Sequence, residues 1–429
     1  MIMKIIMINH TFQQEQFSKR WKLLAEMHPD WDITLLAPYE YGWRNSSGLT
    51  VTDEKKNLGY QYDSKNFHVH TVRIKQGNAR LGLTWTSQEM IDYIDEHNPD
   101  IVYHIGAHTQ ESLMQILDYK KKKNPKLIVY AFSMRGPVQD ISNIANLRRE
   151  DKSTVKKMLR YGQEIFLKQK LNKLNKYCDA VFCHYPDGKD SFRKEGYKGP
   201  IFMQTQVGVD IDVFYPDQEK RKAIREKYGL GDSFVFASAV RFIKGKGVLE
   251  MLDAFPVDGD WKYLLMGSGT ESEVAAIREK IKERGIEDKV ILPGFIEWKD
   301  MAAHWNAADC CVHFTQSTPQ WVETFSLTLV QAMATKLPVI GSSSGSVPYQ
   351  VGSDGIIVDE KDIARLHDEL QWMVNHPEEA KSIGQKLYDR TVRSFSTKHL
   401  NNLFYATVTD LLNGVYDERK VDMADCDIQ

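Results

Sequence analysis

Short apolar runs of strand length alternate with longer amphipathic stretches through the first half of the chain. Between the runs, segments such as 87–97 repeat their apolar residues at helical spacing. Strands that alternate with helices are typical of a parallel sheet covered by helices. The strands expected in this half are 4–8, 33–37, 101–104, 127–132 and 180–184.

A second series of the same kind begins after Tyr215-Pro216. Its expected strands are 234–239, 263–266, 290–292, 310–314, 338–340 and 355–358, again with helical stretches between them. The pattern therefore predicts two α/β domains joined near residues 205–216. A further helix is expected over 396–412, and the acidic tail beyond Gly414 is expected to fray.

The composition is that of a globular protein, with 42% hydrophobic and 11% aromatic residues among 429, enough for two or three domains. Lys and Arg number 56 against 58 Asp and Glu, so the formal net charge is -2. A chain without a basic excess lacks the charge that neutralises a nucleic-acid backbone. We therefore expect no bulk binding of nucleic acid.

The cysteines and the apolar runs indicate a cytoplasmic protein. The five cysteines include no C-x-x-C pair, which fits free thiols in a reducing compartment better than a metal site. The first apolar run is too short for a signal-peptide core, and no stretch approaches the roughly 18 apolar residues needed to span a bilayer. A membrane contact would have to be peripheral.

One segment is strongly basic: between Arg148 and Lys176, ten Lys and Arg face three acids, with apolar residues near helical spacing. A basic amphipathic helix can dock on anionic lipid, here at the inner face of the membrane. A surface helix with a solvated charged face explains the same pattern. The run 120–123 has the same two interpretations, so a peripheral membrane contact stays open.

Two cations, Arg241 and Lys246, flank a loop that follows an expected strand. The loop leads into an expected helix over 248–255, whose first N–H groups favour anions. Guanidinium binds phosphate oxygens bidentately and ammonium adds a compact charge, so this arrangement suits a diphosphate without Mg²⁺. Solvated surface charges are the alternative, but a position at the carboxyl end of a strand favours a ligand site.

Farther on, Glu323 lies in a loop that opens a helix, and Gln331 follows eight residues later on roughly the same helical face. Polar groups there suit a ribose or sugar hydroxyl, although the helix dipole equally explains a carboxylate at a helix start. The small-residue turn 341–348 allows either a close ligand or an ordinary tight turn. A G-x-G loop at Gly267 is by itself a weak signal.

Taken in order, these pieces resemble the C-terminal donor domain of the large group 1 family of retaining glycosyltransferases, which have the GT-B fold. The resemblance covers about residues 205–360, whereas the N-terminal half matches mainly in layout. The matching residues are Arg241-x4-Lys246-Gly, the G-x-G loop, Pro293-Gly-Phe, Ala308-Asp, Glu323-x7-Gln331-Ala-Met-Ala and Pro338-Val-Ile.

The resemblance implies an α/β fold of two Rossmann-like domains that face a central cleft. The first domain, over 1–207, would take the acceptor, and the second, over 208–395, would bind the nucleotide sugar. A helix over 396–414 is expected to return to the first domain, followed by a flexible tail over 415–429.

The resemblance also implies an activity and a site. The activity is retaining transfer of a hexose from a nucleotide sugar, with UDP favoured, to the hydroxyl of a glycan, lipid-linked, protein or small-molecule acceptor. Neither a metal nor a cofactor is implied. Arg241 and Lys246 would hold the diphosphate, Glu323 would contact the transferred sugar, and Gln331 would face the ribose. The other donor-side residues implied are Gly267 and, through their backbone N–H groups, Thr324, Phe325, Ser326 and Leu327.

The chain departs from the family's pattern in several places. Gln331 stands where Glu is usual, Tyr349 stands where an acid is common, and residues 9–12 replace a glycine-rich loop. Ser133-Met-Arg135 stands where many members have a histidine that touches the sugar. The candidates for that work on the acceptor side are Arg135, His104 and His108, and for each histidine a structural or surface role is the alternative.

Other functions compete with this one. A catalytically silent GT-B subunit would bind a glycan, a peptide or a partner enzyme; Gln331 and the missing histidine favour it, whereas Arg241, Lys246 and Glu323 oppose it. A glycogen-phosphorylase-like role would require a lysine for pyridoxal phosphate in a recognisable setting, which the sequence does not show. Asp-x-Asp triplets suit a metal-dependent transferase, but none lies at a convincing strand end.

Overall fold

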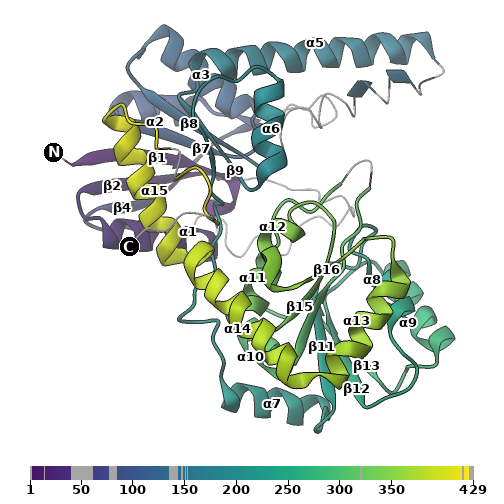
Figure 1. Ribbon diagram of the computed structural model, residues 1–429. Helices are drawn as coiled ribbons and strands as arrows, with labels where there is room; N and C mark the ends of the chain where they lie inside the picture. Colours follow the sequence, from purple (N-terminus) through teal and green to yellow (C-terminus); the bar gives the residue numbers. More distant parts are fainter. Residues whose placement is uncertain are drawn as a thin grey trace. The chain divides into compact units, whose positions relative to one another are not determined.

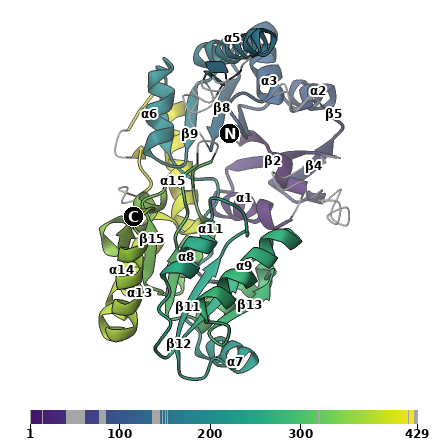
Figure 2. The same cartoon turned by 90° about the vertical axis from the view of Figure 1, so that its right-hand side faces the viewer.

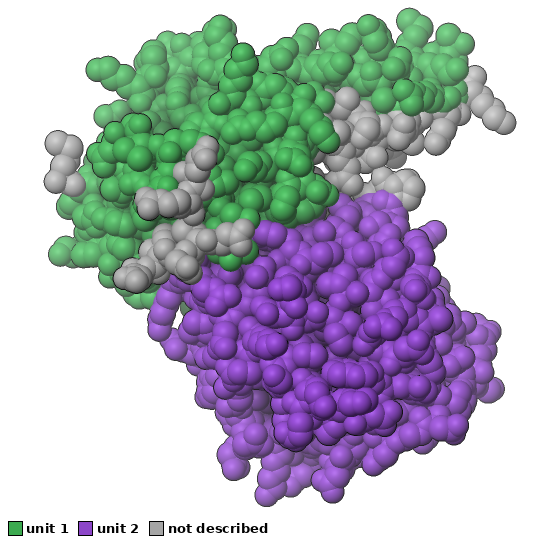
Figure 3. Space-filling model, in the orientation of Figure 1, with its two compact units in different colours: residues 1–206, 400–428 green, residues 207–399, 429 purple. Residues whose placement is uncertain are grey.

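The structure is a computed structural model that describes residues 2–13, 15–39, 61–76, 85–134, 144–145, 148–149, 151, 153–318, 321–417 and 420–424. The chain forms two compact units, which Figure 3 colours separately. Unit 1 comprises Met1–Gln206 and Leu400–Ile428, and unit 2 comprises Val207–His399. The boundaries expected from the sequence are residues 207 and 395.

Unit 1 is built on a sheet of order β10-β9-β8-β7-β1-β2-β4-β3, in which β3 is antiparallel to β4 and the other pairings are parallel. The central strand β7 is buried along its whole length, which explains why four of its five residues are hydrophobic and only His104 is not. Its strands are β1 (Met3–Ile8), β2 (Trp31–Pro38), β3 (Tyr62–Asp63), β4 (Phe67–Val72), β7 (Ile101–Ile105), β8 (Ile128–Ser133), β9 (Ala180–Cys183) and β10 (Ile201–Met203).

Helices lie on either side of the unit 1 sheet (Figures 1 and 2). Ser87 begins α2, its side chain accepting from the Met90 N–H, and Asn98 ends it in the left-handed conformation with φ 41°. The helices are α1 (Glu15–Met27), α2 (Gln88–His97), α3 (Glu111–Lys122), α5 (Thr154–Tyr177), α6 (Pro186–Lys194) and α15 (Thr397–Leu412), with a 3₁₀ turn His10–Gln13 and a separate strand pair β5 (Lys75–Gln76) and β6 (Trp85–Thr86).

Unit 2 has a wholly parallel sheet of order β13-β12-β11-β14-β15-β16, the Rossmann order 3-2-1-4-5-6. Its strands are β11 (Phe234–Ala239), β12 (Trp261–Met266), β13 (Val290–Gly294), β14 (Cys310–His313), β15 (Val339–Ser342) and β16 (Ile356–Val358). Its helices are α7 (Gln218–Tyr228), α8 (Val248–Ala254), α9 (Glu271–Arg284), α10 (Trp298–Ala307), α11 (Leu327–Ala334), α12 (Val347–Val351), α13 (Ile363–Asn375) and α14 (Pro377–Ser394), with a 3₁₀ turn Gly352–Asp354.

The α/β class, the parallel sheets and the strands expected from the sequence are confirmed, with ends that differ by a few residues. The sequence does not predict β4 or β10. In β4, buried Phe67 and Val69 alternate with the partly exposed His68 and His70, so the strand lacks a continuous apolar run. The strand β10 has only three residues.

Residues 400–424 of the chain complete the core of unit 1. Phe404 of α15 stacks on Tyr103 of β7 with ring centroids 5.3 Å apart. The buried guanidinium of Arg20 on α1 donates to Asn401 Oδ1 at 3.0 Å and to the Thr205 carbonyl at 2.6 Å. A charge buried in this way is stabilised only while those acceptors stay in place. The first half of α15 is thereby tied to α1 and β7.

The segment after α15 differs from the flexible tail expected over 415–429. The Met203 N–H donates to the Val421 carbonyl at 2.6 Å, and the Met423 N–H donates to the Met203 carbonyl at 3.0 Å. Val421 and Met423 are both buried. The expectation of fraying was therefore wrong for residues 420–424, because two apolar side chains among the acids pack beside β10.

Candidate active site

The residues singled out in unit 2 lie at the carboxyl edge of its sheet. β11 and β14 are neighbours there, and the strand order reverses between them. In open α/β sheets, ligands bind beyond the carboxyl ends of the strands at such a reversal. Arg241 and Lys246 follow β11, whereas Glu323 follows β14.

The loop after β11 is pressed against the segment that follows β14. Gly245 and Gly247 have φ 95° and 65°, a conformation that favours glycine. The Gln316 N–H donates to the Gly245 carbonyl at 2.8 Å. A Cβ on Gly247 would stand 1.8 Å from the Phe314 carbonyl oxygen. The glycines thus allow a close backbone approach that places Lys246 beside the Glu323 loop.

Gly247→Ala is expected to destabilise unit 2 by about 2–3 kcal/mol, because the new methyl group collides with the Phe314 carbonyl in addition to straining φ. Gly285→Ala is the matched control: Gly285 has φ 64°, and a Cβ there would meet nothing within 4 Å. Its cost should be about 1 kcal/mol. Urea unfolding of both variants measures the difference in the free energy of unfolding. Equal midpoints would contradict the proposed collision with the Phe314 carbonyl.

Lys246 and Glu323 form one ion pair. Lys246 Nζ lies 2.5 Å from Glu323 Oε2 and 4.5 Å from the centre of the Trp321 ring. The Glu323 side chain is buried and that of Lys246 is largely so. The exposed Arg241, by contrast, forms no ion pair within the described part of the chain. The sequence predicts separate roles for Lys246 and Glu323, but their side chains are in direct contact.

A third group, His313 at the end of β14, completes this cluster. His313 Nε2 lies 3.6 Å from Glu323 Oε2. Burial lowers the pKa of His313, although the neighbouring Glu323 carboxylate acts in the opposite direction. Burial alone would raise the pKa of Glu323, but the contact with His313 and the charge of Lys246 lower that pKa to about 2. The carboxylate of Glu323 is therefore ionised at neutral pH.

His313 and Trp321 were missed in the sequence. His313 lies near the end of an expected strand, 310–314, next to the point where the strand order reverses, and that position is the signal that could have found it. Trp321 had no comparable signal, because it lies in a loop between the strand and the helix.

The small-residue turn after β15 holds the backbone of Glu323. The Ser346 N–H donates to the Glu323 carbonyl at 2.8 Å, and a Cβ on Gly345 would stand 2.0 Å from that oxygen. The sequence allows a close ligand or a tight turn at this place. The close approach observed is to the protein's own backbone, which positions the Glu323 side chain.

The helix after Glu323 begins later than the sequence suggests. α11 starts at Leu327, and the Ser326 hydroxyl accepts from the Leu329 N–H at 3.3 Å as its N-cap. The prediction that Glu323 and Gln331 share a helical face was therefore wrong, because Glu323 precedes the helix. Glu323 also does not cap the helix; Ser326 does.

The backbone N–H groups expected to meet a donor are partly used inside the protein. Ser326 N–H donates to Gln350 Oε1 at 2.8 Å, and Phe325 packs edge-on against Phe395. In the loop after β11, the N–H groups of Phe242 and Lys246 donate to the carbonyls of Ser268 and Ile243. Thr324 and Leu327 lie at the same end of α11, partly exposed. Side chains must therefore carry more of any anion binding than the sequence suggests.

Gln331 is buried within unit 2. Its Oε1 lies 3.5 Å from Trp305 Nε1, and its Nε2 has no hydrogen-bond partner among the described residues. A buried amide N–H without an acceptor is costly, so Gln331, only 1% exposed, carries an unsatisfied donor inside unit 2. Gly267 has a different explanation: its N–H donates to the Gly294 carbonyl at 2.9 Å, and a Cβ would stand 1.8 Å from the Val240 carbonyl.

The acceptor-side candidates lie in unit 1, at the carboxyl edge of its sheet. His104 Nε2 lies 2.8 Å from the Ser112 hydroxyl, and His108 Nδ1 lies 2.9 Å from the Ser133 hydroxyl. Both side chains are buried, and burial lowers the pKa of each to about 3. These contacts favour the structural alternative. Arg135 lies outside the described residues.

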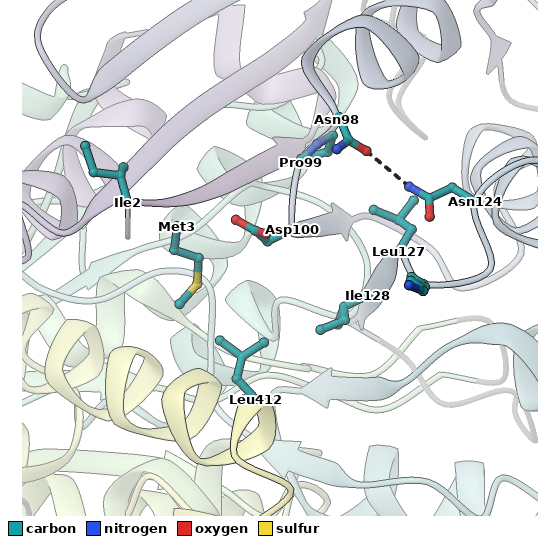
Figure 4. Close-up of a pocket in the computed structure, with 10 residues that line it drawn as sticks. Ile2, Met3, Asn98, Pro99, Asp100, Asn124, Leu127, Ile128 and Leu412 are labelled. Atoms are coloured by element: carbon teal, nitrogen blue, oxygen red, sulfur yellow. Dashed lines mark hydrogen bonds between the residues drawn. The ribbon is translucent and has the colours of Figure 1, made fainter.

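A cavity of about 430 Å³ lies at the opposite edge of the unit 1 sheet (Figure 4). Its lining includes Met3, Asp100 and Ile128, which stand at the amino ends of their strands, and Leu412 at the end of α15. Ligand sites of such sheets lie at the carboxyl edge. None of the candidate residues lines this cavity.

No helix in the described part of the chain is long and apolar enough to cross a membrane.

Comparisons with known sequences match the part of the chain that contains Arg241, Lys246 and Glu323. The family described as "Glycosyl transferases group 1" matches residues 220–390. A GDP-mannose-dependent alpha-(1-6)-phosphatidylinositol monomannoside mannosyltransferase of Mycolicibacterium smegmatis is 28% identical over 41% of this chain and 48% of its own length. A D-inositol 3-phosphate glycosyltransferase of Corynebacterium diphtheriae is 26% identical over 51% of each chain. The chain thus spans about half the length of the curated relatives it matches.

Comparisons with solved structures extend over nearly the whole chain. Sucrose-phosphate synthase from Thermosynechococcus elongatus superposes with a TM-score of 0.69 and 16% identity, covering 96% of this chain and all of the other. Anabaena Alr3699/HepE in complex with UDP gives 0.67 and 15% identity, covering 95% and 100%. At these identities the likeness shows the fold alone. The chain therefore has the GT-B fold, and its residues 220–390 are similar to the family of group 1 glycosyl transferases.

Proposed function

We propose that this chain transfers a sugar from a nucleotide-diphosphate sugar to an acceptor hydroxyl. The observation that carries the proposal is the cluster at the carboxyl edge of the unit 2 sheet: Lys246 paired with buried Glu323, beside the exposed Arg241. Relatives named for GDP-mannose and a fold neighbour that holds UDP support a nucleotide sugar as donor. A UDP-sugar is the donor we favour, and GDP-mannose is its main competitor.

In the proposed reaction, the cations act on the leaving group. Arg241 would bind phosphate oxygens bidentately, and Lys246 has three N–H donors to divide between Glu323 and the diphosphate. As the bond between the anomeric carbon and the phosphate oxygen breaks, both cations stabilise the charge that develops on that oxygen. Glu323, whose backbone carbonyl accepts from the Ser346 N–H, would contact the transferred sugar.

The proposed stereochemistry is retaining. The acceptor hydroxyl attacks the anomeric carbon from the face that the diphosphate leaves, a new carbon–oxygen bond forms, and the departing phosphate oxygen takes the proton. No protein nucleophile is needed. The ionised Glu323 and the cation Lys246 supply electrostatic stabilisation rather than proton transfer.

Activity is expected to persist in EDTA. Two side-chain cations neutralise the leaving diphosphate in this proposal, so a divalent metal has no required part. Sugar transfer or slow donor hydrolysis would be measured with EDTA and with added Mg²⁺ or Mn²⁺. Comparable rates would support the cationic site, whereas strict dependence on added metal would contradict it.

The first test of the function itself is a binding screen. Thermal shift and calorimetry, with EDTA present, would compare UDP, GDP, ADP and their sugar conjugates. Saturable stabilisation by one nucleotide that is lost in Lys246→Ala would support a transferase and identify its donor. If no nucleotide stabilises the protein, the catalytically silent subunit is favoured. Gln331, which stands where the family usually has glutamate, also favours that alternative.

A further inference from the structure

The second half of α5 is anchored to the body of unit 1. Leu167, Leu171 and Leu174 are buried. Lys170 Nζ lies 2.6 Å from Glu111 Oε1, and Lys173 Nζ lies 2.8 Å from Asp118 Oδ1, both on α3. Apolar packing and two ion pairs therefore hold residues 167–174 against α3.

The first half of the helix carries its apolar residues outward. Figure 1 shows this half extending beyond α3. Six large apolar side chains there are between 41% and 71% exposed, and no other described helix carries more than one such side chain. These residues, the outer stripe, are Val155, Met158, Leu159, Tyr161, Ile165 and Phe166.

The spacing places most of the outer stripe on one side of the helix. Positions 155, 158, 159, 162, 165 and 166 follow the three- and four-residue steps of a helical face. Gly162 lies within the stripe, and a Cβ on it would meet nothing within 4 Å. A different side of the helix meets its neighbours, because Glu164 pairs with Arg148 at 2.8 Å and Arg160 with Asp151 at 3.5 Å.

The charge of α5 is one-sided. The helix contains seven Lys and Arg and one acid, Glu164, which Arg148 already neutralises. Lys156, Lys157 and Lys168 form no ion pair with any described residue. An exposed apolar stripe on a helix that also carries these cations matches a surface that is apolar inside and negatively charged outside.

We propose that the outer stripe of α5 docks on an anionic membrane surface. The apolar side chains would enter the boundary between headgroups and acyl chains, while Lys156, Lys157 and Lys168 contact lipid phosphates. Charge argues against a second copy of the chain as the occupant, since pairing two such helices would bring cation against cation. The docking goes beyond the proposed transfer reaction and is measurable without any donor.

The test is flotation of the full chain with vesicles of phosphatidylcholine alone or mixed with phosphatidylglycerol. The natural chain should bind only the anionic vesicles. Met158→Glu/Leu159→Glu should weaken binding about 100-fold, because two large apolar contacts are lost. Gly162→Leu, which extends the stripe into open space, should strengthen it about tenfold.

A matched pair of variants separates docking from general attraction of a basic surface. Lys156→Glu/Lys157→Glu should weaken partitioning about 30-fold or more. Lys121→Glu/Lys122→Glu makes the same change of charge at the end of α3 and should have little effect. Circular dichroism would check that each variant is folded.

Three results would overturn the proposal. Flotation of the natural chain with neither vesicle type would show that the stripe has no lipid partner; concentration-dependent dimers lost in Met158→Glu/Leu159→Glu would then identify a second copy instead. Unchanged vesicle binding of Met158→Glu/Leu159→Glu would show that the outer stripe is not the part that contacts lipid. Equal losses of vesicle binding in Lys156→Glu/Lys157→Glu and Lys121→Glu/Lys122→Glu would show that the vesicles attract basic surface in general and not α5 in particular.

Discussion

Replacing Lys246 with alanine is expected to lower the turnover of sugar transfer by about 10²–10³-fold, or roughly 3–4 kcal/mol of transition-state stabilisation. In the proposed reaction, Lys246 stabilises the charge that develops on the departing diphosphate. Lys244→Ala is the control, because Lys244 lies in the same loop but is exposed and forms no ion pair with a described residue. Equal turnover of Lys246→Ala and Lys244→Ala would contradict the proposed contact of Lys246 with the diphosphate.

Loss of Lys246 also leaves the carboxylate of Glu323 buried without its nearest cation. A buried charge that loses its partner costs several kcal/mol, so Lys246→Ala should also lower the midpoint of unfolding. The double variant Lys246→Ala/Glu323→Gln removes the unpaired charge. We expect it to regain stability while staying inactive, which would separate the chemical role of the ammonium from its structural role.

Acid is expected to destabilise unit 1 strongly between pH 6.5 and pH 5. Burial lowers the pKa of both His104 and His108 to about 3; a charge on His10 adds to the effect at His104 and that of Lys170 adds to it at His108. Both imidazoles are neutral in the folded unit and become protonated on unfolding below pH 6.5. The unfolded chain then binds more protons than the folded one, so the free energy of unfolding decreases as the pH is lowered.

The size of this effect follows from the pKa values. Between pH 7 and pH 5 each histidine contributes a loss of about 2 kcal/mol, and the two together about 4 kcal/mol. Urea unfolding at pH 7 and pH 5 measures it. Variants His104→Asn and His108→Asn should flatten the pH dependence, whereas His97→Asn, at the exposed end of α2, should leave it unchanged. A flat profile in the natural chain would contradict the prediction.

The sequence predicts the parts of the fold that local pattern controls. The buried parallel strands of unit 2 are short, predominantly apolar runs, so their places follow from the sequence pattern. Arg241 and Lys246 could be singled out as candidates because their loop follows the carboxyl end of a strand, where such sheets bind ligands. The cation pair and Glu323 were thus recognisable before any contact was known.

The remaining features depend on contacts between distant segments. The pairing of Lys246 with Glu323 requires the loop after β11 to pack closely against the segment after β14. Two glycines allow this close packing, but their presence in the sequence does not predict it. The burial of Gln331 depends on Trp305 of α10, and the beginning of α11 depends on Gln350. Such contacts leave no periodic signal in the residues concerned.

The return of the chain to unit 1 has a consequence for protein synthesis. Residues 207–399 form a continuous stretch that can fold as soon as it leaves the ribosome. Unit 1 emerges first but lacks Phe404, Val408 and Val421 of its core until residues 400–424 follow. The buried Arg20 likewise waits for Asn401. During translation, the apolar surface that α15 later covers is therefore open to chaperones for the time needed to synthesise all of unit 2.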